Sequence, residues 1–176
     1  YIGEPPCRHK KVAVRPHVAI MDTGVGTHPW LTNVVTEDTP SLTPLDPNTD
    51  PETWGDLSGP LDGELDTNSG HGTFIAGLIH QACPDADIYS WRIVDSEGPA
   101  AETRVIAALI GVVELVRKYY DREEGGLRID VLSLSLGFFH ESADDTLTEY
   151  LVGAAKAGKV TARISVAADT LPGTGV

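Results

Sequence analysis

The sequence has 176 residues, and its 13 Lys and Arg against 26 Asp and Glu give a formal net charge of −13 at pH 7. This excess of negative charge disfavours binding to the phosphate backbone of nucleic acids. Hydrophobic residues make up 41% and charged residues 22% of the chain, as in an average globular protein, so residues 1–176 are expected to form a single domain. No apolar run reaches the roughly 18 residues that a membrane-spanning helix needs, so we expect no membrane segment in this chain.

The first expected element is a short buried strand. Residues 17–21 read H-V-A-I-M and lie between Pro16 and the turn signal at residues 23–24. A short apolar run bounded in this way is typical of a strand in a parallel sheet. Asp22 is therefore predicted at the carboxyl end of this strand, where its carboxylate can be held rigidly beside a cleft.

A long acidic segment follows this strand. Residues 32–69 contain five prolines and nine acidic side chains, and no Lys or Arg occurs between Arg15 and Arg92. Segments of this length without hydrophobic periodicity are uncommon inside compact domains. We expect residues 32–69 to be an acidic, Pro-rich loop insertion that is solvated.

The spacing of apolar residues predicts alternating helices and strands beyond residue 69. In chain order these are a helix after Gly70 that ends before Pro84, a strand at 86–94, a helix at 101–120, a strand at 129–136 and a helix around 147–155. In the first of these helices, the apolar residues Phe74, Ile75, Leu78 and Ile79 lie on one face, and the small residues Gly72, Ala76 and Gly77 leave room for close backbone packing. The alternation predicts an α/β fold, with a mostly parallel sheet covered by helices on both faces.

Two segments carry residues suited to catalysis. Asp22 opens the tripeptide D-T-G, although an Asp that caps a turn after a strand is common for local reasons alone. His71 begins a helix within residues 69–77 (S-G-H-G-T-F-I-A-G), where the neighbouring glycines let other backbone approach its ring. An Asp at a strand end and a His at a helix start supply two of the three members of a nucleophilic relay.

These motifs resemble those of the subtilisin-like serine peptidases. The family's aspartate motif, V-A-(I/V)-x-D-(T/S)-G with H-P following, is matched by residues 18–29, and its histidine motif, H-G-T-x-x-A-G, by residues 71–77. A third match, V-L-S-L-S-L-G at residues 131–137, is similar to the family strand that pairs with the substrate backbone. The resemblance spans Val18 to about Ala157 and implies a three-layer subtilisin-like domain that is incomplete at its C-terminus.

The resemblance also implies roles for single residues. Asp22 would orient His71 and stabilise its imidazolium, and His71 would take a proton from a serine hydroxyl and return it to the leaving amine. Ser135, Leu136 and Gly137 would form an edge that binds an extended polypeptide substrate through main-chain hydrogen bonds. The alternative for the Ser135 side chain is local packing in the sheet. The implied activity is that of a serine endopeptidase.

Two expected motifs are not found. The family's nucleophile lies in a G-T-S-x-(A/S)-x-P segment, which this sequence lacks, and no Asn occurs beyond Asn68 to stabilise an oxyanion. We expect the serine to lie outside this chain and the chain alone to be inactive. Because the sequence after Lys159 matches the family poorly, we expect a truncation or a change of reading frame near Gly158.

Two other functions remain open. The chain could be a subtilisin-like module that binds peptides without cleaving them, with the serine and the oxyanion donor truly lost. It could also be an aspartic peptidase that uses Asp22 in D-T-G. No second D-T-G or D-S-G occurs, and helical periodicity at residues 101–120 is unlike the mostly β fold of those enzymes.

Cofactors, location and thiols are less constrained. We expect no cofactor, but subtilisin relatives often bind calcium, and the acidic side chains from Glu37 to Asp66 could supply oxygen ligands. The resemblance implies an extracellular or cell-envelope location, although no signal peptide lies near Tyr1.

Cys7 and Cys83 could form one disulfide or be two buried thiols.

Overall fold

The structure is a computed structural model. It describes residues 4, 6–31, 50, 52–57, 62–97 and 99–136, together with the backbone of residues 35–36 and 163–166.

The strands in these residues form one sheet in which all pairs are parallel. Their order across the sheet is β2-β3-β1-β4-β5. The strands are β1 (His17–Asp22), β2 (Val35–Thr36), β3 (Asp87–Arg92), β4 (Val131–Leu134) and β5 (Arg163–Val166). The parallel sheet confirms the expected α/β class and places the carboxyl ends of β1, β3 and β4 at one edge.

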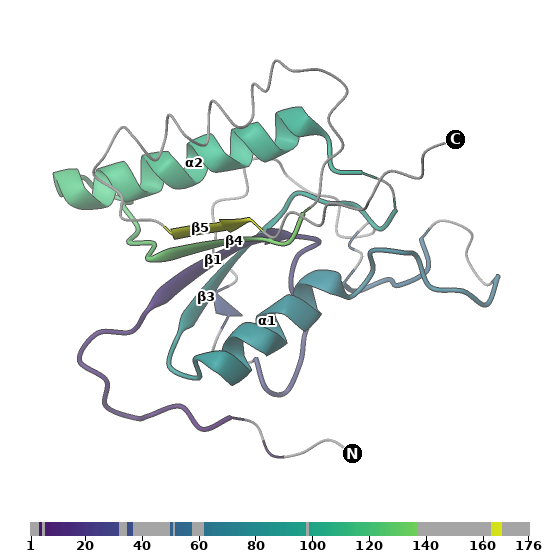
Figure 1. Cartoon of the computed structure of the whole chain (residues 1–176), viewed down its shortest axis with the longest axis horizontal. Coiled ribbons are helices and arrows are strands. Elements are labelled where there is room, and N and C mark those ends of the chain that lie inside the picture. Colours follow the sequence, from purple (N-terminus) through teal and green to yellow (C-terminus); the bar gives the residue numbers. More distant parts are fainter. Residues whose placement is uncertain are drawn as a thin grey trace, which may run out of the picture.

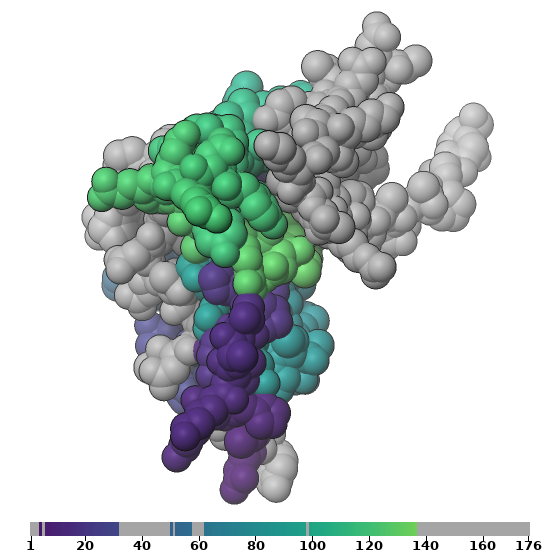
Figure 2. Space-filling model, turned by 90° about the vertical axis from the view of Figure 1, so that its left-hand side faces the viewer, coloured from purple at the N-terminus to yellow at the C-terminus, as the bar shows by residue number. Residues whose placement is uncertain are grey.

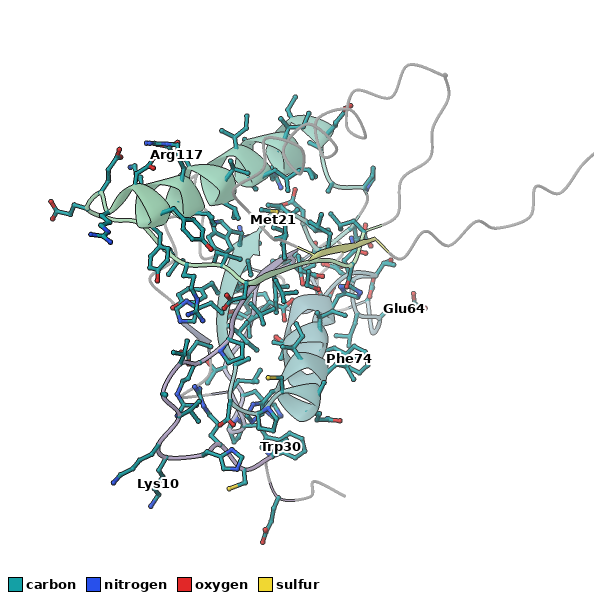
Figure 3. All side chains as sticks on the ribbon, turned by 60° about the vertical axis from the view of Figure 1, so that its left-hand side comes forward. Lys10, Met21, Trp30, Glu64, Phe74 and Arg117 are labelled. Atoms are coloured by element: carbon teal, nitrogen blue, oxygen red, sulfur yellow. The ribbon has the colours of Figure 1, made fainter. Side chains whose placement is uncertain are left out.

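Two helices cover opposite faces of this sheet (Figure 1). They are α1 (His71–Ala82) and α2 (Glu102–Asp121). Because side chains alternate along a strand, Ala19 and Met21 of β1 pack in the cluster under α2, whereas Ile20 packs in the cluster under α1. Met21 extends toward α2 in Figure 3. Three layers are thus present, as expected.

The buried side of α1 differs from the apolar face that the sequence suggests. Phe74 and Leu78 are 63% and 45% exposed, and Phe74 extends outward from the helix in Figure 3. Ile75 and Ile79 are partly buried and pack against the apolar cluster. The fully buried residues are Gly72, Ala76 and His80, which follow one another at intervals of four. Small side chains at two of these positions let α1 lie close to the sheet.

The N-terminal segment, drawn in purple in Figure 2, runs below the green surface of α2. Arg8 pairs with Asp87 at the start of β3. The backbone N–H of His9 donates to Asp85 Oδ1 at 2.7 Å, and its Nδ1 lies 2.6 Å from Asp85 Oδ2. These hydrogen bonds from His9 lower the pKa of the Asp85 carboxyl. Residues 8 and 9 are therefore tied to the turn that precedes β3.

The structure differs from the sequence-based expectations for the acidic segment and for the two cysteines. The segment 32–69 is not loop throughout, because Val35–Thr36 pairs with β3. Cys7 and Cys83 are free thiols, and Cys7 is exposed, so neither the disulfide nor a pair of buried thiols is found. The helix expected around 147–155 lies outside the described residues. No helix in the described part of the chain is long and apolar enough to cross a membrane.

Candidate active site

Asp22 is the last residue of β1 and lies at the carboxyl edge of the sheet. Its side chain is almost completely buried, with 1% exposed. Its Oδ1 accepts the backbone N–H of Thr23 at 2.7 Å and lies 3.2 Å from the Thr23 hydroxyl. The carboxylate is thus held rigidly at the position that the sequence indicates.

His71 is the first residue of α1 and reaches Asp22 across 49 positions of sequence. Gly70 precedes the helix with φ of 81°, a left-handed conformation that favours glycine. His71 Nδ1 lies 2.7 Å from Asp22 Oδ1, while 43% of the His71 side chain is exposed. An ionised Asp only accepts hydrogen bonds. Nδ1 must then carry the proton, which leaves Nε2 as the nitrogen that can take up another.

The loop after β1 and the first turn of α1 are in direct contact. A Cβ added to Gly72 would lie 1.9 Å from the carbonyl oxygen of Gly24, so no side chain fits there. The Gly72 N–H donates to the Thr23 hydroxyl at 2.8 Å, and in return the Gly26 N–H donates to the Thr73 hydroxyl at 2.7 Å. This close approach explains why a glycine follows the histidine in the motif.

A family model matches most of the chain. The family model for the subtilase family, Peptidase S8, matches residues 15–169. The chain belongs to the subtilase family. No curated protein and no solved structure matches the chain.

The matched range corrects one expectation about this subtilase. The sequence was expected to lose its likeness to the family near Gly158, at a truncation or frame change. The match instead continues to residue 169, and Arg163–Val166 forms β5, parallel to β4. The likeness to the family therefore extends past Gly158, while a truncation or a change of reading frame stays a prediction.

The residues expected to bind substrate follow β4. Leu134 is in register with Met21 of β1, so Ser135 comes level with Asp22 at the same edge of the sheet. Ser135 is exposed, and Leu136 is half-buried against the core beneath α2. Gly137 lies outside the described residues. Substrate binding by these three residues stays a prediction for this subtilase.

One residue of this site was missed by the sequence analysis. Glu52 was treated as part of a solvated acidic segment, but it is half-buried and accepts hydrogen bonds from the hydroxyls of Thr23 and Thr73. Beside it, Asp50 Oδ1 lies 3.6 Å from the guanidinium of Arg92, whose side chain is 9% exposed. Nothing in the sequence pattern separates Glu52 from the other acids of residues 32–69.

Of the nine acidic side chains in the segment expected to bind calcium, six lie in the described part of the subtilase chain. Within the described part, no group of three or more His, Cys, Asp or Glu side chains is arranged to hold a metal ion. Calcium binding by the acidic segment stays a prediction.

Proposed function

We propose that this chain carries the Asp and His members of the catalytic triad of a serine endopeptidase, with the nucleophilic serine supplied by sequence beyond this chain. The observation that supports the proposal most directly is the 2.7 Å contact between His71 Nδ1 and Asp22 Oδ1. The carboxylate is buried while the imidazole is partly exposed. This difference in burial suits Asp22 as the group that orients the imidazole and His71 as the base that reaches the substrate.

The proposed chemistry uses the two ring nitrogens of His71 differently. Nε2 takes the proton of the serine hydroxyl as the serine oxygen bonds to the scissile carbonyl carbon, and the same nitrogen then protonates the amine as the C–N bond breaks. Asp22 holds Nδ1–H and stabilises the imidazolium. General acid–base groups placed in this way contribute roughly 10²- to 10⁴-fold in rate.

The proposed substrate is an extended polypeptide. Ser135 and Leu136 follow β4 beside Asp22, at the carboxyl edge of the sheet. An extended chain bound there would add main-chain hydrogen bonds to those of the sheet. From the family resemblance we propose that the protein acts outside the cytoplasm, either in the cell envelope or in the extracellular space.

The test compares this chain with an extended protein, defined as the chain plus whatever its coding DNA specifies after Val176. We expect the extended protein to contain the G-T-S-x-(A/S)-x-P segment, to be labelled by a fluorophosphonate and to cleave a denatured protein substrate. We expect the 176-residue chain alone to do neither. Asp22→Asn and His71→Ala in the extended protein should abolish cleavage.

Other results would favour the other functions. A coding region that ends without a serine motif, with a folded chain that binds peptides and does not cleave them, would overturn the proposal in favour of a peptide-binding module. Cleavage at acid pH that pepstatin blocks would support an aspartic peptidase. The parallel sheet and the His71–Asp22 contact give that third function no support.

A further inference from the structure

Glu52 touches both of the segments that carry the Asp22–His71 pair. Its Oε1 accepts a hydrogen bond from Thr23, the residue after Asp22, and its Oε2 accepts one from Thr73, two residues after His71. One carboxylate therefore bridges the loop that follows β1 and the first turn of α1.

The hydrogen bonds in this bridge can be assigned by counting protons. Each threonine hydroxyl has one proton to donate and can also accept. The Thr23 oxygen accepts the Gly72 N–H and the Thr73 oxygen accepts the Gly26 N–H. The Thr73 proton is then left for Glu52 Oε2. The Thr23 proton is assigned to Glu52 Oε1, which lies closer to the hydroxyl than Asp22 Oδ1 does. An acceptor at both oxygens is what a carboxylate provides and an amide does not.

The same count applies to Asp22 Oδ1. Three groups lie within hydrogen-bond distance of it, namely the Thr23 N–H at 2.7 Å, His71 Nδ1 at 2.7 Å and the Thr23 hydroxyl at 3.2 Å. A carboxylate oxygen has two lone pairs. When Glu52 takes the Thr23 hydroxyl proton, both lone pairs of Asp22 Oδ1 are left for the Thr23 N–H and for His71.

The segment around Glu52 is packed in place. Its own N–H donates to Asp50 Oδ1 at 3.0 Å, and Asp50 also pairs with Arg92, which is in register with Asp22. A Cβ added to Gly26 would lie 2.9 Å from the Glu52 carbonyl oxygen. Glu52 is thus fixed by contacts on its side chain and on its backbone.

We propose that Glu52 is a positioning residue for the Asp22–His71 pair. By accepting both threonine hydroxyls, it holds the Asp22 loop against the start of α1, so that Asp22 Oδ1 stays directed at His71 Nδ1. The effect on catalysis rests on the proposed peptidase function, whereas the effect on the pair itself does not.

The first experiment uses NMR on the 176-residue chain. The signals are the low-field Nδ1–H proton of His71 and the hydrogen exchange of the Gly26 and Gly72 amides. In Glu52→Gln, the amide can accept only one of the two hydroxyl protons. We expect at least one of the two glycine amides to exchange about tenfold faster or more, and the His71 signal to broaden or disappear.

The matched control is Glu64→Gln. Glu64, labelled in Figure 3, belongs to the same acidic segment but is exposed, so this variant should give the native His71 signal and native exchange. If Glu52→Gln also gives native values, the proposal is overturned. Should Glu52→Gln fail to fold by circular dichroism, Thr73 replaces it as the test. Thr73→Val should lose the His71 signal and Thr73→Ser should keep it, whereas equal signals in the two variants would overturn the proposal.

The second experiment measures kinetics in the extended protein. Displacing the catalytic pair should lower kcat about tenfold or more in Glu52→Gln, with KM close to native, because substrate contacts are unchanged. Native kcat in an active enzyme would overturn the positioning role and leave the peptidase proposal standing. No cleavage by the unmutated extended protein would overturn the peptidase proposal, while the NMR result would still decide the role of Glu52.

Discussion

The two faces of the sheet are built for different tasks. On the α2 side, alternate residues of β1 join a large cluster of buried apolar side chains that includes Trp91, Leu109 and Leu132. On the α1 side the apolar cluster is small, and Asp22 and His80 are buried with it. The α2 face therefore supplies most of the apolar burial, whereas the α1 face has less apolar contact and holds polar groups in fixed positions. Four substitutions test this difference between the two faces.

Asp22→Asn should abolish most of the activity proposed for the α1 face. With an amide in place of the carboxylate, His71 is held in the wrong tautomer, and kcat of the extended protein should fall about 10⁴-fold. The melting temperature should change little, since the substitution preserves shape. Activity within tenfold of native would show that the His71–Asp22 contact is not catalytic.

Gly72→Ala should separate the two segments of the site. Its Cβ would lie 1.9 Å from the Gly24 carbonyl oxygen, so the loop or the helix must move, and the low-field NMR signal of His71 should be lost. Gly77→Ala is the matched control, because nothing lies within 4 Å of a Cβ there. We expect that control to keep the His71 signal and to gain up to about 1 kcal/mol of stability. A native His71 signal in Gly72→Ala would contradict the close approach.

Leu109→Ala should lower stability without changing the site. Leu109 of α2 is 3% exposed in the large cluster, and its loss should cost about 2–5 kcal/mol in urea unfolding. The His71 signal should persist, because Leu109 packs on the opposite face. Ile110→Ala removes a similar side chain that is 50% exposed and should have a much smaller effect. Equal losses of unfolding free energy in the two variants would show that burial beneath α2 does not stabilise the fold.

His80 should make stability depend on pH. Burial, with a smaller repulsion from Arg8, lowers the pKa of His80 below the ordinary value of 6.5. The unfolded chain therefore binds a proton first as the pH falls through about 6.5. The contribution of neutral His80 to the free energy of unfolding is fully present above this pH and decreases below it. Between pH 7.5 and 5.5, the free energy of unfolding in urea should decrease less for His80→Leu than for the native chain. An equal decrease in both would show that His80 is not the source of the pH dependence.

Much of the fold was open to prediction from local patterns. The apolar run at residues 17–21 lies within β1, and the expected helix at 101–120 is α2, displaced by one residue. In both cases the hydrophobic period reports which side is buried. For α1 the same reasoning was half right. Ile75 and Ile79 pack against the apolar cluster, whereas Phe74 and Leu78 are exposed. Periodicity of large apolar residues does not detect contact between backbones.

Short-range periodicity and contiguous motifs were enough to predict the α/β class, the succession of β1, α1, β3, α2 and β4, and Asp22 with His71 as the candidate pair. The tertiary structure was needed to show that Gly72 meets the Gly24 carbonyl and that Glu52 joins the two motifs. Both facts depend on contacts between segments that are distant in the chain. Nothing in the spacing of residues 32–69 records which acidic side chain folds back onto Thr23 and Thr73.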